Sequence, residues 1–532
     1  MEADYVIVGA GSAGCVLAER LSADGASVLL LEAGPPDTSP FIRVPAGVVK
    51  LINHPVYDWK YRSAAEPNAD GRVINLPRGR VLGGTSSING MKFVRGHPSD
   101  FDGWAQMGCR GWSYADLLPH FKAIESFEGG DDAYRGRTGP MKVAFYDTIL
   151  PITHRFVEAA RQAGYPLSPD LNGATTDGIC YSQMSRRGRF RHSSATAFLG
   201  RARGRNNLRI ETGVLATRLL FDGRRCVGVA GRRDGQDFVA RARREVIVSG
   251  GSINSPQLLQ LSGIGPAAHL QKIGVEVIHD LPGVGSNLSD HYAVPVTARV
   301  KDATTINQLR RFPRIVVEMA KWALAARGAL TFGATSASVF ARSRPDLASP
   351  DLQLMLFPGS FTPLLIGPPV IERDPGIRVS VSLARPRSRG SIMAVSPDPA
   401  TPPDIHLNYL ADPDDIRALM SGIRQVRNIL TQKAIAPHIV VETGPGSEAQ
   451  SDADLLPHIR ATGTTVHHLV GTCRMGEDDR AVVDSRLRVR GIGGLRVVDA
   501  SVMPQVTTGN TNAPTIMIGD KGAAMIREDA KA

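Results

Sequence analysis

Residues 5–34 read YVIVGAGSAGCVLAERLSADGASVLLLEAG. The apolar runs at 5–8 and 28–31 have the length and character of buried strands, and the segment between them has the apolar spacing of a helix. A strand, a glycine-rich turn, a helix and a second strand together make a βαβ unit. The N-terminal part of the chain is therefore predicted to be an α/β nucleotide-binding fold.

The glycine spacing in this turn is typical of a site for a dinucleotide pyrophosphate. The first glycine permits the tight turn, the second lets the backbone approach the phosphates, and the third lets the helix pack on the strand. The free N–H groups of the helix N-terminus favour the negative charge. We expect contacts with the cofactor from this segment at Gly9, Gly11, Ser12, Ala13 and Gly14.

Glu32 ends the second strand, about 20 residues after the turn. A carboxylate at this point can accept hydrogen bonds from the ribose hydroxyls of the adenosine, and we expect Ala33 to line the same site. The negative charge argues against a 2′-phosphate and hence against NADP. It leaves both NAD and FAD open.

The composition is that of a well-packed protein. A length of 532 residues predicts two large structural units, and a hydrophobic fraction of 42% excludes a disordered chain. The net charge of +11 is spread along the sequence, so we expect no nucleic-acid partner. Five cysteines without CxxC spacing argue against a disulfide framework and a zinc site, and we expect no metal and a reducing compartment.

The strand that starts at Tyr5 leaves no room for a secretion signal ahead of it, so we expect a cytoplasmic protein. No apolar run reaches the ~20 residues of a transmembrane segment. Residues 313–332 have the pattern of an amphipathic helix. We expect this helix to pack on its own domain, while a peripheral contact with the inner membrane stays open.

Further glycine- and histidine-containing motifs are distributed along the chain. They are RGRVLGGTSSINGM at 78–91, GGSINSPQLLQLSGIG at 250–265, VHHLVGTCRMG at 466–476, VDASVMP at 498–504 and GNTNAPT at 509–515. Their joint occurrence in this order resembles the glucose-methanol-choline (GMC) oxidoreductases. The resemblance extends over essentially the whole chain and looks closest to bacterial choline, alcohol and sorbose dehydrogenases.

The resemblance implies an α/β fold in which a Rossmann-like FAD-binding domain carries a substrate domain built on an antiparallel sheet covered by helices. Because the motifs are far apart, the FAD domain must be discontinuous. We expect it to comprise residues 1–160, 205–300 and 466–532, and we expect the substrate domain to comprise residues 161–204 and 301–465.

The family pattern also implies which residues surround FAD beyond the glycine turn. Val214 would flank the adenine, and the flavin side would be lined by Gly84, Asn89, Gly90, Asp499, Ala500, Asn510 and Thr511. Relatives with a covalently attached flavin carry a histidine in the first motif, where this chain has Ile88. We therefore expect FAD to be bound without a covalent bond.

Alcohol oxidation by a flavin requires removal of the hydroxyl proton and transfer of a hydride to flavin N5. A histidine suits the first role because its ordinary pKa is ~6.5. The resemblance implies that His468 is the base and that Asn512 orients the alcohol oxygen. His467 is expected to have a structural role, and Cys473 is expected to be a packed core residue.

The expected activity is oxidation of an alcohol, most simply a primary alcohol to its aldehyde. A dehydrogenase that uses a quinone or a cytochrome is favoured, and an oxidase that uses oxygen and produces hydrogen peroxide is the alternative. A flavin-containing lyase, which catalyses no net redox reaction, is the least favoured candidate. The sequence does not identify the alcohol.

Overall fold

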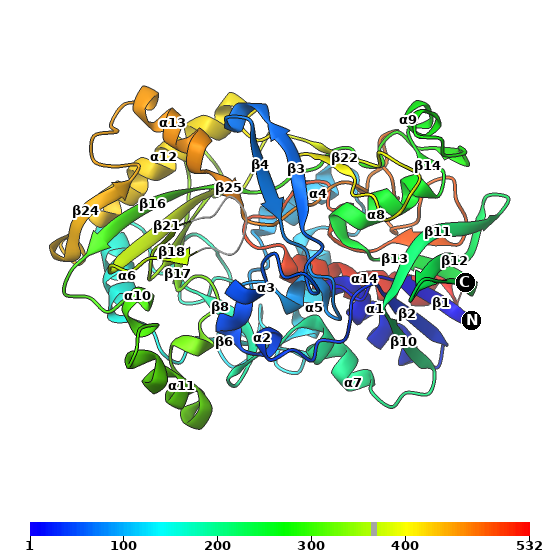
Figure 1. The fold of residues 1–532 in the computed structure, drawn as a ribbon, viewed down its shortest axis with the longest axis horizontal. Coiled ribbons are helices and arrows are strands. Elements are labelled where there is room, and N and C mark those ends of the chain that lie inside the picture. The colour runs from blue at the N-terminus through cyan, green and yellow to red at the C-terminus, as the bar shows by residue number, and fades with distance from the viewer. Residues whose placement is uncertain (363–369, 532) are drawn as a thin grey trace.

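The computed structural model describes residues 1–362 and 370–531, which form two units side by side (Figure 1). Each unit is centred on a seven-stranded sheet. The nucleotide unit, on the right in Figure 1, contains both the N-terminal strand and the C-terminal helix. The substrate unit lies on the left. This arrangement confirms the predicted fold class.

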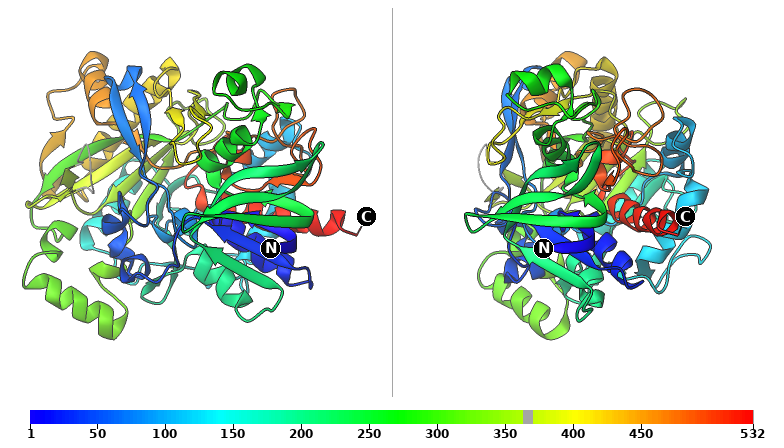
Figure 2. Two further views of the ribbon diagram at one scale, coloured as in Figure 1. Left: turned by 45° about the vertical axis from the view of Figure 1, so that its right-hand side comes forward. Right: turned by 90° about the vertical axis from the view of Figure 1, so that its right-hand side faces the viewer.

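The nucleotide unit is built on a sheet with a parallel core. In spatial order its strands are β10 (Leu208–Thr212), β2 (Val28–Glu32), β1 (Glu2–Val8), β13 (Gln236–Val248), β12 (Arg225–Arg233) and β11 (Val214–Asp222), with β26 (Leu495–Val497) also paired to β13. Helices α1 (Ser12–Ser22) and α14 (Asn512–Asp529) pack against each other, as Figure 2 shows. The last segment of the chain therefore completes the fold that the first segment begins.

The glycine turn is required by close backbone contacts. A Cβ atom added at Gly14 would lie 1.9 Å from the carbonyl oxygen of Gly9, and one added at Gly9 would lie 2.4 Å from that of Ser249. Gly9 also has a φ of +102°, which side chains rarely adopt. The predicted steric roles of Gly9 and Gly14 are thus confirmed.

The substrate unit is built on an antiparallel sheet. Its strands, in spatial order, are β24 (Ile439–Gly444), β16 (Tyr292–Val300), β21 (Gly376–Leu383), β18 (Leu352–Phe357), β17 (Ala337–Ala341) and β7 (Gly178–Tyr181), and β25 (Thr464–Thr465) also pairs with β16. One face packs on helices α6 (Pro151–Gln162), α12 (Pro413–Leu430) and α13 (Asp452–Thr462). The other face is directed at the nucleotide unit. Because strands alternate, residues two apart on β21 share one face.

Helix α12 begins at a capped turn. The side chain of Asp412 accepts a hydrogen bond of 2.8 Å from the backbone N–H of Asp414, and Pro413 is the first helical residue.

The predicted domain boundaries need correction. β16, which was assigned to the FAD segment ending at 300, pairs with β21 and β24 in the substrate sheet. α6 was likewise assigned to the first FAD segment, but its apolar face lies in the substrate core. Conversely, residues 195–199 pack in the nucleotide core. An apolar strand does not indicate which sheet it joins, because that depends on tertiary pairing.

The other elements connect and cover these two sheets. The helices are α2 (Pro40–Arg43), α3 (Val48–Leu51), α4 (Pro98–Gln106), α5 (Tyr114–Ile124), α7 (Gly200–Ala202), α8 (Gly251–Leu261), α9 (Ala267–Lys272), α10 (Ile306–Leu309) and α11 (Arg314–Ala325). The strands are β3 (Tyr61–Glu66), β4 (Arg72–Leu76), β5 (Glu125–Phe127), β6 (Met141–Phe145), β8 (Gln183–Arg187), β9 (Phe190–Arg191), β14 (Ile264–Gly265), β15 (His279–Asp280), β19 (Phe361–Thr362), β20 (Val370–Ile371), β22 (Ser391–Met393) and β23 (Asp404–His406).

Helix α11 is the amphipathic helix that the sequence predicts, but its broad apolar face is turned outward. It projects from the lower edge of the molecule in Figures 1 and 2. Trp322 faces inward and donates to the carbonyl of Arg189 at 3.2 Å, whereas Phe312 and Leu324 are 84% and 87% exposed. Within the described part of the chain, no helix has the length and apolarity needed to cross a membrane.

The close contact of α1 with the glycine turn predicts a large effect of Gly14→Ala. The added methyl group overlaps a backbone carbonyl that cannot move independently, so we expect a loss of about 3 kcal/mol or more in the free energy of unfolding. Gly103→Ala in α4 is the control, since its added Cβ would meet no described atom within 4 Å beyond the local backbone of its own helix, and it should stabilise by up to about 1 kcal/mol. Urea unfolding of both variants measures this difference. Equal stability would contradict the packing described here.

Candidate active site

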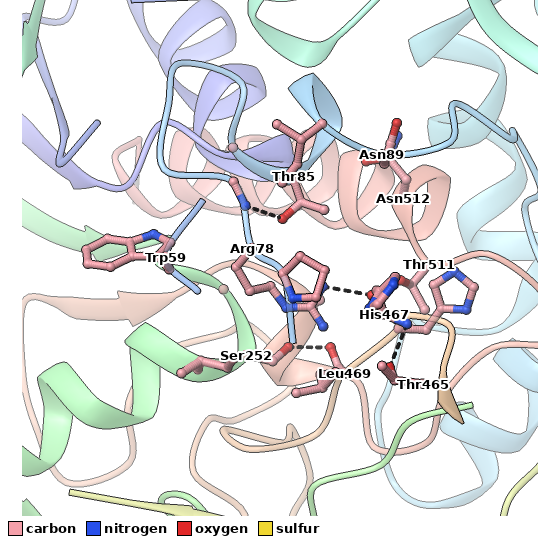
Figure 3. Close-up of a pocket in the computed structure, with 18 of the residues that line it drawn as sticks. Trp59, Arg78, Thr85, Asn89, Ser252, Thr465, His467, Leu469, Thr511 and Asn512 are labelled. Carbon is pink, nitrogen blue, oxygen red and sulfur yellow. Dashed lines mark hydrogen bonds between the residues drawn. The ribbon is translucent and has the colours of Figure 1, made fainter. Parts of the chain in front are cut away.

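One cavity of about 800 Å³ runs from the glycine turn of the nucleotide unit to the substrate sheet. Figure 3 shows its central part. The structure brings nearly all predicted site residues to its walls, and only Gly14 does not line it, since that glycine packs α1 on the turn. The lining includes Gly9, Gly11, Ser12, Ala13, Glu32, Ala33, Gly84, Asn89, Gly90, Val214, His468, Asp499, Ala500, Asn510, Thr511 and Asn512.

The nucleotide end of the cavity has the donor and acceptor groups that a dinucleotide needs. Both carboxylate oxygens of Glu32 accept backbone hydrogen bonds, from Ala10 at 2.9 Å and from Gly34 at 2.8 Å. Burial raises the pKa of Glu32 to about 7, while those two amides oppose the shift. A Cβ added at Gly11 would meet only one atom within 4 Å, so the backbone here is open to a ligand.

The middle of the cavity fits a flat ligand with polar edges. The backbone of Gly251, at the first turn of α8, has a φ of +83° and no atom within 4 Å of an added Cβ. Asp499 holds this turn, because its Oδ2 accepts from the Gly251 N–H at 2.8 Å and from the Ser255 hydroxyl. The buried Oδ1 of Asn510 has no hydrogen-bond partner among the described residues. These features fit a flavin, and Ile88 at the predicted tether position has no atom that could bond to it covalently.

A chain of hydrogen bonds fixes the protonation of His468. The Nε2 of His291 lies 3.1 Å from the carbonyl oxygen of Ala384, and a carbonyl can only accept, so this Nε2 carries the proton. Burial lowers the pKa of His291 to about 4, so the ring is neutral and its Nδ1 is an acceptor. The Nδ1 of His468, 2.9 Å away, must therefore be the donor. The Nε2 of His468 is therefore unprotonated and accepts a hydrogen bond of 3.0 Å from the amide nitrogen of Asn510.

The environment keeps this nitrogen unprotonated at neutral pH. Burial is the main cause that lowers the pKa of His468 well below its ordinary value, and His291, His467 and Arg78 add to the effect. The side chain is 8% exposed and lines the cavity. His468 is therefore a buried, neutral acceptor beside the expected flavin site.

Asn512, the residue that the family resemblance implies for orienting the alcohol oxygen, lines the cavity, but the asparagine hydrogen-bonded to His468 is Asn510. Asn510 occupies the position beside His468, while the Oδ1 of Asn512 accepts a hydrogen bond of 2.8 Å from the Ser12 hydroxyl in α1. Asn512 is the first residue of α14, and Asn510 lies two residues earlier, before the helix begins. Side chains at these two positions point in different directions. The NTNAPT motif alone does not predict this difference, because the same residue type stands at both positions.

The backbone around the histidine pair is held by buried polar groups. Asp290 accepts from the backbone N–H of His468 at 2.7 Å and from the hydroxyls of Thr465 and Tyr409. Arg78 donates to the carbonyl of His467 at 2.8 Å, as Figure 3 shows. This bond supports the left-handed backbone of His467, whose φ is +68°.

The imidazole of His467 also lines the cavity. Its Nδ1 is buried without a partner among the described residues, and burial together with Arg78 lowers its pKa to about 3. Cys473 is fully buried in the nucleotide core, as expected. Sequence reasoning missed Asp290 and His291, and the adjacent Asp–His pair just before an apolar strand was the available signal.

Comparisons with known proteins agree with this architecture. The GMC oxidoreductase family matches the chain at residues 3–293 and again at residues 386–519. The chain is 40% identical over 527 residues to a protein named oxygen-dependent choline dehydrogenase from Brucella canis, covering 98% of this chain and 95% of the relative. The protein of the same name from Rhizobium etli is 42% identical over 529 residues, with the same coverage of both chains.

Solved structures are similar along their full length. Pyridoxine 4-oxidase from "Mesorbium loti" has a TM-score of 0.90 and 30% identity, and Aspergillus oryzae RIB40 formate oxidase has a TM-score of 0.92 and 28% identity. Both cover 100% of this chain and 99% of their own. The chain belongs to the GMC oxidoreductase family. It is an FAD-dependent oxidoreductase that acts on CH–OH donors, which confirms the family, cofactor and reaction class predicted from its motifs.

Proposed function

We propose that this protein oxidises a primary alcohol to its aldehyde, with His468 as the general base and Asn510 as the residue that orients the alcohol oxygen. The observation that carries the proposal is the chain from Ala384 through His291 to His468, which leaves His468 Nε2 unprotonated and hydrogen-bonded to the Asn510 amide at the wall of the cavity. A base must hold its lone pair before the substrate arrives. Because the pKa of His468 is lowered, its side chain is unprotonated at neutral pH and can accept the hydroxyl proton.

The chemistry is divided between the cofactor and these side chains. FAD, when bound, supplies the acceptor for the hydride that leaves the carbinol carbon. His468 Nε2 takes the hydroxyl proton, and the resulting positive charge is stabilised by the Nδ1 of His291, which accepts the Nδ1–H of His468. Asn510 has a second N–H with which to hold the oxygen while negative charge develops on it. A hydride leaves carbon readily only when that oxygen is electron-rich, so both side chains act in the transition state.

We propose further that an acceptor other than oxygen, a quinone, takes the electrons at a membrane surface. Helix α11 supports this proposal. Four apolar residues of α11 are more than half exposed, namely Val316, Val317, Met319 and Leu324, and so is Phe312, two residues before the helix begins. The exposed cations of the same segment are Arg310, Arg311, Arg314, Lys321 and Arg327.

The charge of this surface favours an anionic bilayer as the partner. The acid in segment 310–327, Glu318, is buried and bonded to Lys321 at 2.7 Å, so the exposed charges of the segment are all positive. An apolar face bordered by cations is the pattern of a helix that lies in an anionic membrane interface. The five cysteines are free and buried, which supports a reducing, cytoplasmic location on the inner side of that membrane.

The proposed roles predict a specific order among four alanine variants. His468→Ala should slow anaerobic flavin reduction by about 10²- to 10⁴-fold, because general base catalysis contributes that much. Asn510→Ala should cost about 1–3 kcal/mol of transition-state stabilisation. Asn512→Ala should mainly weaken FAD retention, because Asn512 contacts α1, and His467→Ala should act mainly through packing. Stopped-flow absorbance at matched FAD content measures all four.

A reduction rate near the parental value in His468→Ala would contradict the assigned base. If Asn512→Ala slows flavin reduction more than Asn510→Ala does, Asn512 is the residue that orients the alcohol oxygen.

The α11 surface predicts binding to vesicles that contain phosphatidylglycerol. Replacing both Phe312 and Leu324 by serine should reduce binding about tenfold or more, because two side chains lose their apolar burial in the interface. Val440→Ser, at an apolar residue 58% exposed on β24, is the control and should bind like the parent. Vesicle co-sedimentation measures binding. Equal binding to neutral phosphatidylcholine vesicles, or an unchanged double variant, would show that α11 does not dock on anionic lipid.

A further inference from the structure

The substrate end of the cavity, where it meets the sheet face formed by β16, β18 and β21, is positively charged. Two buried cations line this end, Lys92 and Arg378. Among the described residues that line the whole cavity, the carboxylates are Glu32 and Asp499, and both belong to the nucleotide unit. Residues 363–369, which lie outside the described chain, read PLLIGPP and contain no ionisable side chain.

Arg378 is prepared to bind an anion. It is 6% exposed, and its guanidinium lies over the ring of Phe361, 4.4 Å from the ring centroid. Its Nε has no hydrogen-bond partner among the described residues. Glu372, the acid whose charge acts on the pKa of Arg378, is already paired with Arg299 at 2.8 Å. Burial lowers the pKa of Arg378 to about 10, so the side chain stays protonated at neutral pH.

Lys92 is a second buried cation, and it has no acidic partner in the described part of the chain. It follows directly on the first flavin motif and is 4% exposed. Its Nζ donates to the hydroxyl of Ser338 and lies 6.0 Å from the centroid of the Phe340 ring. Burial lowers the pKa of Lys92 to about 8, and its charge contributes to the low pKa of His468. A charge buried beside a neutral hydroxyl alone is costly, which indicates that an anion completes the site.

The register of the sheet places both cations within the span of one small molecule. Ser338 on β17 is paired with Met355 on β18, which is paired with Ser380 on β21. Arg378 lies two residues from Ser380 on the same face. With strands about 4.8 Å apart and two residues spanning about 6.7 Å, the Cα atoms of Ser338 and Arg378 are roughly 12 Å apart. Met355 and Phe357 line the cavity between them and suit an apolar body.

We propose that the alcohol substrate carries a carboxylate, which Arg378 binds and Lys92 further attracts while the hydroxyl lies at His468. The inference rests on the proposed function and narrows its substrate to hydroxy acids with an apolar body. Arginine pairs with a carboxylate through two parallel hydrogen bonds, which makes it suited to this role. A trimethylammonium alcohol would instead place a third positive charge in this end of the cavity, so this chain differs in substrate from the choline dehydrogenases that it resembles.

The proposal is tested first by binding, with ligands that have no hydroxyl to oxidise. The holoenzyme is titrated with 4-methylbenzoate, 4-methylbenzamide and trimethyl(4-methylphenyl)ammonium while the flavin spectrum is recorded. We expect the carboxylate to bind roughly 10- to 100-fold more tightly than the amide, since a hydrogen-bonded charge pair contributes that much, and the cation to bind most weakly. An amide or ammonium ligand that binds as tightly as the carboxylate would overturn the proposal.

Two variants assign the effect to the named side chains. Arg378→Met should remove most of the preference for the carboxylate, and Lys92→Met should reduce it, in both cases with FAD still bound. Arg424→Met, at an exposed arginine of α12 paired with Asp452, is the matched control and should leave the preference unchanged. If Arg378→Met does not fold, Lys92→Met and the three-ligand comparison in the parent still decide. A full preference retained in both folded variants would overturn the assignment.

A second arm separates this inference from the proposed function. Anaerobic flavin reduction is compared for 4-(hydroxymethyl)benzoate, 4-(hydroxymethyl)benzamide and choline. If 4-(hydroxymethyl)benzoate at low concentration reduces the flavin faster than the other two alcohols, both proposals are supported. Fastest reduction by choline overturns the carboxylate while leaving alcohol oxidation intact. If none of the three reduces the flavin, the proposed function is challenged, and the binding titration still decides the charge preference.

Discussion

The hydrogen bond between the Nδ1 atoms of His291 and His468 is the interaction on which the active site depends. Two Nδ1 atoms can form a hydrogen bond only if one ring donates and the other accepts. The carbonyl of Ala384 accepts from Nε2 of His291, so His291 Nδ1 is the acceptor and His468 Nδ1 is the donor. This carbonyl follows β21 in the substrate sheet, whereas His468 lies in the segment that returns to the nucleotide unit. The protonation of the proposed base is thus set by contact between the two units, and Asp290 fixes the backbone that makes the contact possible.

The same arrangement explains why one cavity can serve both cofactor and alcohol. The nucleotide end is formed by close backbone approaches at glycine, and the other end is formed by side chains that alternate on a sheet face. Between these ends lie buried polar atoms of Asn510, His467 and Arg78 that have no hydrogen-bond partner within residues 1–362 and 370–531. Such atoms are costly unless a ligand satisfies them, so the cavity is organised for bound groups rather than for packing.

The sequence predicts the fold where local chemistry is restrictive. The glycine turn, Glu32 and the order of the motifs identify the nucleotide unit because few other residues fit those backbone positions. It does not predict the sheet that β16 joins, since strand pairing is a tertiary property. It also does not show which asparagine of the NTN motif lies at His468, because the start of α14 between Asn510 and Asn512 turns their side chains apart. Arg378 looks like an ordinary polar residue of an alternating strand until the cavity is seen beside it.

The central claim is that His468 is a neutral base whose pKa is held far below its ordinary value by burial and by neighbouring positive charge. The pH dependence of anaerobic flavin reduction tests this most directly. A base works above its pKa, so a lowered pKa extends activity toward acid. The rate at saturating alcohol should stay level from about pH 8 down to about pH 6, below the ordinary histidine pKa of ~6.5. A tenfold fall per pH unit that begins at or above pH 6.5 would contradict the account.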